Sequence, residues 1–325
     1  MRTKLLAAFS AAVLTATLTA CAAGSTKESA GDYPSEDLTW TIAFGPGGGN
    51  DLMSRKMVDI IEKKKLYPEN IKVENREGGS GATGWGYLFG KKGTGYDVST
   101  TSGSFLTTPL QSDPGWTYKD FTPVGLMATD DALLLTDGKK KVDSWEEWVA
   151  YAKKKGKVVV GGIGTVNVDF ILHSLIAEQA GYEIEYVPYN EEGQVQTSLL
   201  SGALDAMVSN PGSILGQVEA GKMNALLFTG KEPLASLPDV PTGEEVGIKE
   251  LPSMPRGFIL PPDAPDAAVK WWTKTMKTVV ATKEWKQFVK DNNLTADVRW
   301  GADFGDYLED TTNDFEKTLK EQGAL

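Results

Sequence analysis

The sequence predicts an α/β protein whose two lobes, joined by two crossovers, enclose a cleft. Short apolar segments alternate with amphipathic segments along the chain, which is typical of strands and helices that build largely parallel sheets. A glycine or serine turn joins strand to helix in both halves of the chain. Two extended stretches, residues 122–136 and 257–262, are the predicted crossovers. Because ligands of such sheets bind beyond the carboxyl ends of the strands, we expect a binding site in the cleft.

The first 20 residues are typical of a secretory signal peptide and not of the folded protein. Arg2 and Lys4 are basic, and residues 5–16 form an apolar stretch that is too short to span a membrane. The sequence LTAC at residues 18–21 resembles a bacterial lipobox, in which cleavage before Cys21 leaves that cysteine lipidated. An ordinary signal peptide with an incidental cysteine is the alternative.

The rest of the chain is expected to form a tether and two lobes. Residues 21–36 are small and polar, as in a flexible tether. Lobe 1 is expected to comprise residues 37–129 and 254–325, and lobe 2 residues 130–253. No later segment is long and apolar enough to be predicted as transmembrane. We therefore expect a monomer that its lipid holds to the outer face of a membrane of the cell envelope.

Charge and cysteine content exclude further classes of function. The 325 residues include 33 basic and 44 acidic side chains, which gives a formal net charge of −11. Such an acidic protein has no general positive field for nucleic acid. Cys21 is the only cysteine, so no disulfide can form within one chain.

The first strand, turn and helix are predicted over residues 39–61. Residues 39–44 alternate between polar and apolar, as in a partly buried strand, and the glycines at 47–49 let the backbone turn sharply. We expect Asn50 or Asp51 to cap the helix that follows. The exposed N-terminus of that helix, with its free N–H groups and its dipole, favours an anion.

Three interpretations compete for this turn: a dinucleotide site of the GxGxxG type, a turn without a ligand, and a site for a carboxylate. Asn50 stands where the third glycine of the dinucleotide motif would be, which argues against the first. We favour the carboxylate site, because the same strand–turn–helix unit recurs in both halves of the chain.

The other elements are predicted from the same pattern. Ser144 is expected to cap a helix with Glu147 three residues on, as in a capping box. Proline at 211 suits the first turn of a further helix. The tail, residues 266–322, is amphipathic and predicted to be helical. Further strands are predicted near 71–73, 95–104, 157–162, 184–190, 204–210 and 224–230.

Catalysis is not indicated, and we expect no enzyme, no metal and no cofactor. The single histidine, His173, lies beside an apolar helix face, which is typical of a structural histidine. No Ser–His–Asp arrangement or His/Cys metal spacing can be assembled from the sequence. We recognise no arginine motif in the cleft, so helix N-termini are expected to supply its positive potential. The lysine runs at 139–141 and 153–155 are interpreted as solvated surfaces.

Two interpretations remain open for each of two aspartates. Asp51 either pairs with Arg55 one helical turn on, or orients the glycine turn and binds water beside the ligand. Asp205 either contacts the ligand or a water, which we favour slightly, or only ends a loop before a strand.

Eight motifs in order, from about Tyr33 onward, are similar to those of a known family. They are FGPGGGND (44–51), VENREGGSGATG (73–84), GYDVSTTSGS (95–104), YKDFTPVGLMA (118–128), VPYNEEG (187–193), LLSGALDAM (199–207), EAGKMNALLFTG (219–230) and LPDVPTGEEVG (237–247). Each motif alone is weak, but their order resembles that of the substrate-binding proteins of tripartite tricarboxylate transporters, also called the Bug family.

The resemblance implies a two-lobed Venus-flytrap of the type II periplasmic binding protein kind, which captures a small carboxylate and delivers it to membrane permease subunits. A ligand sensor for a membrane signalling protein, or a secreted enzyme, are the alternatives. By position, the implied ligand contacts are Phe44, Gly47, Gly48, Asn50, Asp51, Ser102, Gly103, Ser104, Gly162, Gly164, Thr165, Asn190, Asp205 and Asn210.

The chain departs from the family pattern near the expected cleft. PYNEEG brings Glu191 and Glu192 to the cleft mouth, and Asp169 follows the turn at Gly164. Trp85 lies inside the second glycine loop. The identity of the carboxylate ligand therefore stays open, and the candidates are di- and tricarboxylates, acidic amino acids and aromatic acids.

Overall fold

The computed structural model describes residues 33–165, 167–189 and 192–325. The predicted signal peptide, most of the tether and Cys21 lie outside the described residues, as do Asn190 and Glu191. Within the described ranges, no helix is both long and apolar enough to cross a membrane.

Lobe 1 is built on a six-stranded sheet in the order β11-β4-β10-β3-β1-β2. β1 pairs in parallel with β2 and β3, whereas β10 is antiparallel to β3 and β4, and β11 is antiparallel to β4. The sheet is mixed because the chain leaves the lobe along β4 and returns beside it along β10. The strands are β1 Leu38–Ile42, β2 Ile71–Asn75, β3 Asp97–Thr100, β4 Thr122–Asp130, β10 Met254–Leu260 and β11 Arg299–Trp300.

Lobe 2 is built on a five-stranded sheet in the order β7-β6-β8-β5-β9. β6 pairs in parallel with β7 and β8, and β5 is antiparallel to β8 and β9. The extended stretch predicted over 122–136 is therefore two strands, one in each lobe, with a break at Asp131 and Ala132. The strands are β5 Leu133–Asp137, β6 Lys157–Ile163, β7 Glu183–Tyr189, β8 Ala206–Ser209 and β9 Met223–Phe228.

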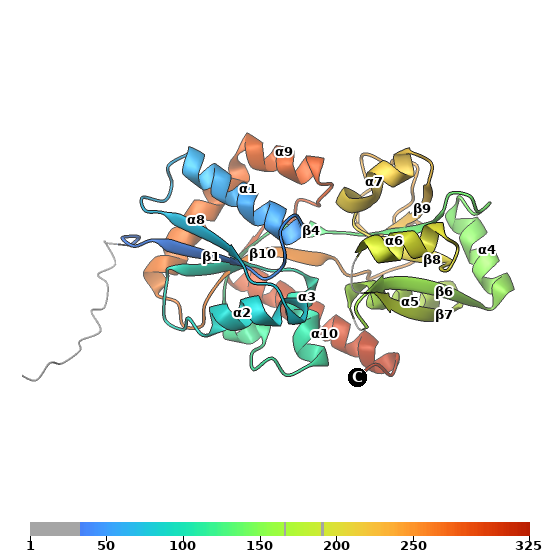
Figure 1. Ribbon diagram of the computed structural model, residues 1–325, viewed down its shortest axis with the longest axis horizontal. Helices are drawn as coiled ribbons and strands as arrows, with labels where there is room; N and C mark the ends of the chain where they lie inside the picture. The colour runs from blue at the N-terminus through green and yellow to red at the C-terminus, as the bar shows by residue number, and fades with distance from the viewer. Residues whose placement is uncertain (1–32, 166, 190–191) are drawn as a thin grey trace, which may run out of the picture.

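Helices cover both faces of each sheet (Figure 1). In lobe 1, α1, α8 and α9 pack on one face and α2, α3 and α10 on the other; in lobe 2, α6 and α7 lie opposite α4 and α5. The helices are α1 Gly49–Lys63, α2 Ala82–Phe89, α3 Gly103–Gln111, α4 Trp145–Lys155, α5 Val168–Ala180, α6 Glu192–Leu200, α7 Pro211–Glu219, α8 Asp266–Ala281, α9 Lys283–Asp291 and α10 Ala302–Glu321, with short 3₁₀ turns η1 Gly79–Gly81, η2 Tyr118–Asp120 and η3 Glu244–Val246.

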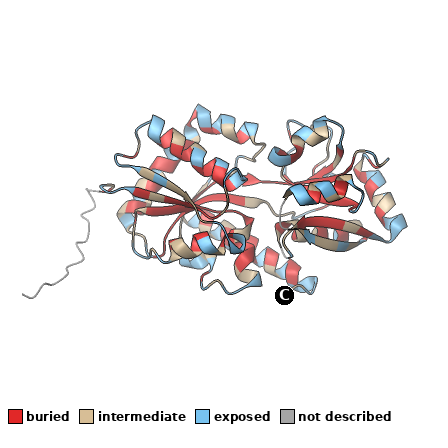
Figure 2. Cartoon of the chain, in the orientation of Figure 1, coloured by how far each residue is buried: buried red, intermediate tan, exposed pale blue. Residues whose placement is uncertain are grey.

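The central strands of both sheets are buried between the helices, whereas the edge strands β2, β7 and β11 are only partly buried (Figure 2). On one face of lobe 1, the Trp40 ring from β1 lies 5.1 Å from Phe258 of β10 and 6.2 Å from Trp272 of α8, centroid to centroid. All three side chains are fully buried. Burying one large apolar side chain contributes about 1.5–3 kcal/mol to stability, so this cluster ties the first strand to elements that come more than 200 residues later.

Polar contacts fix the junction between the lobes. The carboxylate of Asp131, between β4 and β5, accepts hydrogen bonds from Ser253 and Thr295. Burial raises the pKa of Asp131 despite these two bonds. Thr295 also pairs with Thr129 through two backbone hydrogen bonds of 2.9 Å. Three separate segments of the chain therefore meet at this junction.

Candidate ligand-binding site

A cleft of about 480 Å³ lies between the lobes. The turns before α1 and α3 and the loop after β2 form its lobe 1 wall, and the turn after β6 forms its lobe 2 wall. Seven of the predicted contacts come together here. The residues that line it are Phe44, Gly45, Gly48, Gly49, Asn50, Glu77, Gly78, Ser80, Ser102, Gly103, Ser104, Thr107, Gln111, Ile163, Gly164, Asn167, Met254 and Arg256.

The prediction that Asn50 or Asp51 caps α1 is wrong. The helix begins at Gly49 with Gly48 as its N-cap, so both residues fall within the first turn. Asp51 is buried, and its carboxylate accepts bonds from Gly47 N (2.9 Å), Asn75 Nδ2 (2.9 Å) and Arg55 Nε (2.8 Å). Burial raises the pKa of Asp51, but these bonds outweigh it and the pKa lies below its usual range. Asp51 thus braces the turn from outside the cleft lining, and the predicted pair with Arg55 is present.

Two buried polar groups in the lobe 1 wall have no hydrogen-bond partner among the described residues: Ser102 Oγ and Asn50 Nδ2. Asn50 uses its Oδ1 to accept a bond from Thr100, and Ser102 is the N-cap of α3. Asn50 is 3% exposed and Ser102 is 7% exposed. Because buried polar groups are normally hydrogen-bonded, these two indicate a ligand or an ordered water in the cleft.

The N-termini of α3 and α5 meet across the cleft. A Cβ at Gly103 would lie 2.5 Å from Val168 of lobe 2 and 3.1 Å from Met254, so only glycine allows this approach. Asn167 caps α5 by accepting a bond from Val168 N (2.6 Å), and Gly164 before it has φ +72°. Together with α1, three helix N-termini border the cleft, and each favours an anion.

Gly162 and Thr165, two other predicted lobe 2 contacts, are not among the residues that line the cleft. Gly162 is packed so closely against Asp169 and Tyr186 that a Cβ would overlap them, and Thr165 is exposed outside the cleft lining. Asp169 accepts a bond from Ile163 N (2.7 Å), which braces the turn after β6. Burial raises the pKa of Asp169 to about 7, with a smaller contribution from Glu192.

The structure places Asp205 away from the cleft, contrary to our expectation. It precedes β8, which runs parallel to β6, so it lies at the sheet edge opposite to the cleft. Its carboxylate accepts bonds from Tyr151 (2.6 Å) and Val159 N (2.8 Å) and pairs with Lys140 and Lys155. Despite burial, these contacts lower the pKa of Asp205 to about 2. Both lysine runs therefore contribute a partner to a buried carboxylate instead of being wholly solvated.

Asn210 lies at the junction between the lobes, outside the cleft lining. Its Nδ2 donates to Asp130 Oδ1 (2.9 Å) and to the carbonyl of Asp131 (3.1 Å). The other Asp130 oxygen accepts two bonds from Arg256, through Nε and Nη2. Lobe 2 is thus connected through Asp130 to an arginine that lines the cleft.

Sequence reasoning missed Arg256, and the expectation of a cleft without an arginine is wrong. The side chain is 7% exposed, and a Cβ at Gly49 would lie 2.9 Å from its Nη2. The guanidinium therefore lies against the N-terminus of α1. Among the described residues, only its Nε and Nη2 donate to the protein, so Nη1 is available to a ligand. The sequence feature that could have revealed Arg256 is that it is the one charged residue in the otherwise apolar strand β10.

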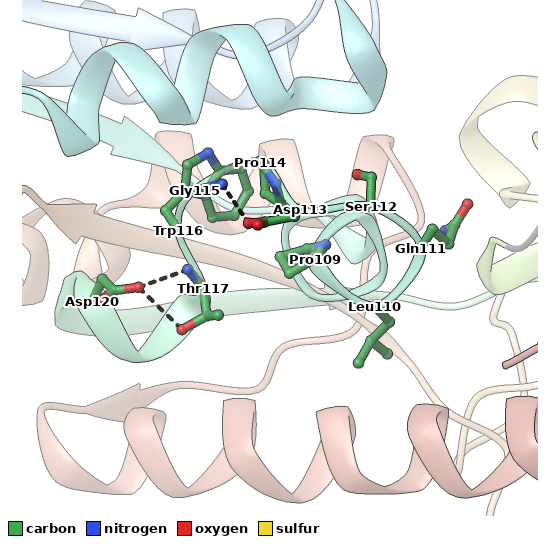
Figure 3. A pocket seen from close by; sticks show the side chains of 10 residues that line it. All are labelled: Pro109, Leu110, Gln111, Ser112, Asp113, Pro114, Gly115, Trp116, Thr117 and Asp120. Carbon is green, nitrogen blue, oxygen red and sulfur yellow. Dashed lines mark hydrogen bonds between the residues drawn. The ribbon is translucent and has the colours of Figure 1, made fainter.

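A second hollow, of about 630 Å³, lies at the end of α3 (Figure 3). Asp113 accepts a bond from Gly115 N (3.0 Å), and Asp120 accepts two from Thr117 (2.7 and 3.1 Å). Its carboxylates are thus engaged within their own loop, and its lining comes from lobe 1 alone. We therefore assign the candidate site to the interlobe cleft.

His173 is structural, as the sequence indicated. It is fully buried, its Nε2 lies 3.3 Å from the carbonyl oxygen of Gly161, and burial lowers its pKa to about 4. Among the described residues, no group of His, Cys, Asp and Glu side chains could hold a metal ion.

Comparison with known proteins agrees with this geometry. The sequence model described as Tripartite tricarboxylate transporter family receptor matches residues 53–323. Protein BugT of Bordetella pertussis is 26% identical over 246 residues, which cover 74% of this chain and 75% of BugT.

Two solved structures show the same fold. MatC from Rhodopseudomonas palustris, solved with bound malate, has 18% identity and a TM-score of 0.74 over 88% of this chain and 100% of its own. An R. palustris protein solved with adipate has 21% identity and a TM-score of 0.75 over 90% of this chain and 99% of its own. The fold is the two-lobed α/β fold of periplasmic binding proteins. Since the family match spans most of the sequence, the chain belongs to the tripartite tricarboxylate transporter receptor family, the Bug family, whose members are solute-binding receptors and not enzymes.

Proposed function

We propose that this receptor captures a small carboxylate in the interlobe cleft and delivers it to the permease subunits of a tripartite tricarboxylate-type transporter. The observation that carries this proposal is the pair of unpartnered buried groups, Ser102 Oγ and Asn50 Nδ2, beside the N-termini of α1 and α3. The related structures that hold malate and adipate support a carboxylate as the ligand.

The lobe 1 wall would hold the carboxylate by hydrogen bonds and by charge. Free N–H groups at the starts of α1 and α3, the Ser102 hydroxyl and Arg256 Nη1 all serve as donors. One hydrogen bond to a charged group contributes about 1.5–3 kcal/mol. A few such bonds give micromolar affinity, which corresponds to about 8 kcal/mol.

Lobe 2 would complete the site when the lobes close. Gly164 and Asn167 bring the N-terminus of α5 to the same space. Closure excludes water, and this strengthens every charge interaction in the cleft. Of the predicted contacts, we retain Phe44, Gly48, Asn50, Ser102, Gly103, Ser104 and Gly164, and we add Gly49, Asn167 and Arg256.

Ser102→Ala tests the site. If Ser102 Oγ donates to the ligand, its removal should weaken carboxylate binding about tenfold, the equivalent of about 1.4 kcal/mol. Stability should hold or increase, because an unpaired buried hydroxyl is lost. Ser201→Ala, at the exposed end of α6, is the matched control. The carboxylates would first be screened by thermal shift and their affinities then measured by calorimetry. A Ser102→Ala protein with wild-type affinity would remove Ser102 from the site.

The receptor acts outside the cytoplasm, as a periplasmic binding protein does. We propose in addition that a lipid on Cys21 anchors it as a monomer to the membrane. Cys21→Ala should release the protein from the membrane fraction or leave it unprocessed. Processed, membrane-bound protein in that variant would exclude the anchor.

A further inference from the structure

One charged side chain in the cleft is not needed to bind a carboxylate. Glu77 follows β2, is exposed, and lines the lobe 1 wall. A Cβ at Gly45 would lie 2.8 Å from Glu77 Oε2, so the carboxylate rests against the turn that leads into α1. An anionic group therefore stands beside the turn that we propose as an anion site.

The protein leaves the charge of Glu77 without a partner: among the described residues it takes part in no ion pair or hydrogen bond. The neighbouring cations are engaged elsewhere. Arg76 pairs with Glu74 and stacks on the Tyr87 ring at 3.6 Å, and Arg55 pairs with Asp51.

The rest of the cleft does not balance this charge with a side chain. Of the described residues that line it, Glu77 and Arg256 are the charged ones, and Arg256 is already paired with Asp130. The lobe 2 lining consists of Ile163, Gly164 and Asn167, which carry no charge. A ligand with a second carboxylate would bring that group near Glu77, and the two like charges would repel each other.

We infer that Glu77 selects ligands that carry a protonated amine in addition to a carboxylate, and disfavours simple dicarboxylates. This inference rests on the proposed carboxylate function of the same cleft. Independent of Glu77, the unpartnered Ser102 and Asn50 in the same wall indicate that a ligand binds there. The ligand's carboxylate would occupy the helix N-termini, and its ammonium group would pair with Glu77.

Acids that share one carbon skeleton test this selection. The six-carbon set is hexanoate, adipate, 2-aminohexanoate and 6-aminohexanoate; the four-carbon set is butanoate, succinate, 2-aminobutanoate and 4-aminobutanoate. Calorimetry at neutral pH would measure each acid against wild type, Glu77→Gln and Glu77→Lys. Glu62→Gln, which removes an exposed carboxylate from the other end of α1, is the matched control.

In at least one of the two sets, an amino acid should bind about tenfold more tightly than the plain acid and the diacid, as one charge-assisted bond predicts. This preference should be the same in wild type and in Glu62→Gln. Glu77→Gln should lose this preference, and Glu77→Lys should prefer the diacid. A wild-type preference for diacids, or an amine preference that persists in Glu77→Gln, overturns the inference and leaves the carboxylate function intact. If none of the eight acids binds to either wild type or Glu77→Lys, the proposed function and the inference are overturned together.

Discussion

The turn before α1 offers a test in which affinity and stability separate. Gly48 has φ −76° and ψ 165°, a conformation open to any residue, and the nearest atom to a Cβ there is the Gly45 carbonyl oxygen at 3.9 Å. Gly47 has φ +85°, which strains any other residue. A side chain at position 48 would therefore fit the backbone and stand in the cleft, whereas one at position 47 would strain the turn.

The two effects can be sized. Gly48→Val should lower the free energy of unfolding by at most about 1 kcal/mol, because a Cβ there meets no clash and the remaining cost is that valine is a poorer N-cap than glycine. Blocking one bond from a backbone N–H to the carboxylate should cost about 1.5–3 kcal/mol of binding, a roughly 10- to 150-fold rise in Kd. Gly47→Ala should instead lose about 1–2 kcal/mol of stability and keep its affinity once folded.

Calorimetry would give the affinities, and urea unfolding followed by circular dichroism would give the stabilities. A folded Gly48→Val protein that binds its carboxylate as tightly as wild type would move the ligand away from α1. Loss of affinity in Gly47→Ala alone would mean that the shape of the turn matters more than the open space at Gly48.

Three further outcomes follow from the hinge and from two buried carboxylates. For Asp205, the folded pKa of about 2 against an ordinary 3.8 corresponds to about 2 kcal/mol. Because the folded pKa is the lower, this contribution to the free energy of unfolding is present above about pH 5 and is lost as the pH falls toward 2. Asp205→Asn should therefore lack this contribution in thermal melts over that pH range, and it should bind the ligand normally. For Asp169, the folded pKa of about 7 is the higher, so wild type should lose stability as the pH rises from about 4 to about 7, and Asp169→Asn should melt with a flatter pH profile. Small-angle scattering should show a smaller radius of gyration with saturating ligand, and an unchanged radius would argue against closure at Asp131 unless the free protein is already closed.

The fold was predictable because its signals are local. The alternation of strand and helix, the turns at Gly48 and Ser102, and the cap of α4, where Ser144 accepts a bond from Glu147 N (3.3 Å), each depend on residues that are close in sequence. The cap of α1 was misassigned because glycine can take the N-cap position itself, which leaves the polar residues after it for other bonds.

The missed features depend on partners far along the chain. Arg256 is held by Asp130, 126 residues away, and Asp205 by lysines 50 and 65 residues away. Composition and periodicity do not show which of many charged residues will meet. The same limit applies to Glu77, whose importance lies in the absence, among the described residues, of a cation that pairs with it.

The central place of β10 in the lobe 1 sheet sets an order for folding. β10 lies between β3 and β4, yet it is made only after the whole of lobe 2. Until then β3 has an open edge, and Trp40 lacks both Phe258 and Trp272 as neighbours. As the chain emerges N-terminus first, lobe 2 is continuous and can close its own sheet first, whereas the lobe that emerges first waits for residues 254–325. A chain that stalls before residue 254 would present an unpaired strand edge and an uncovered Trp40, which are the features that chaperones and proteases recognise.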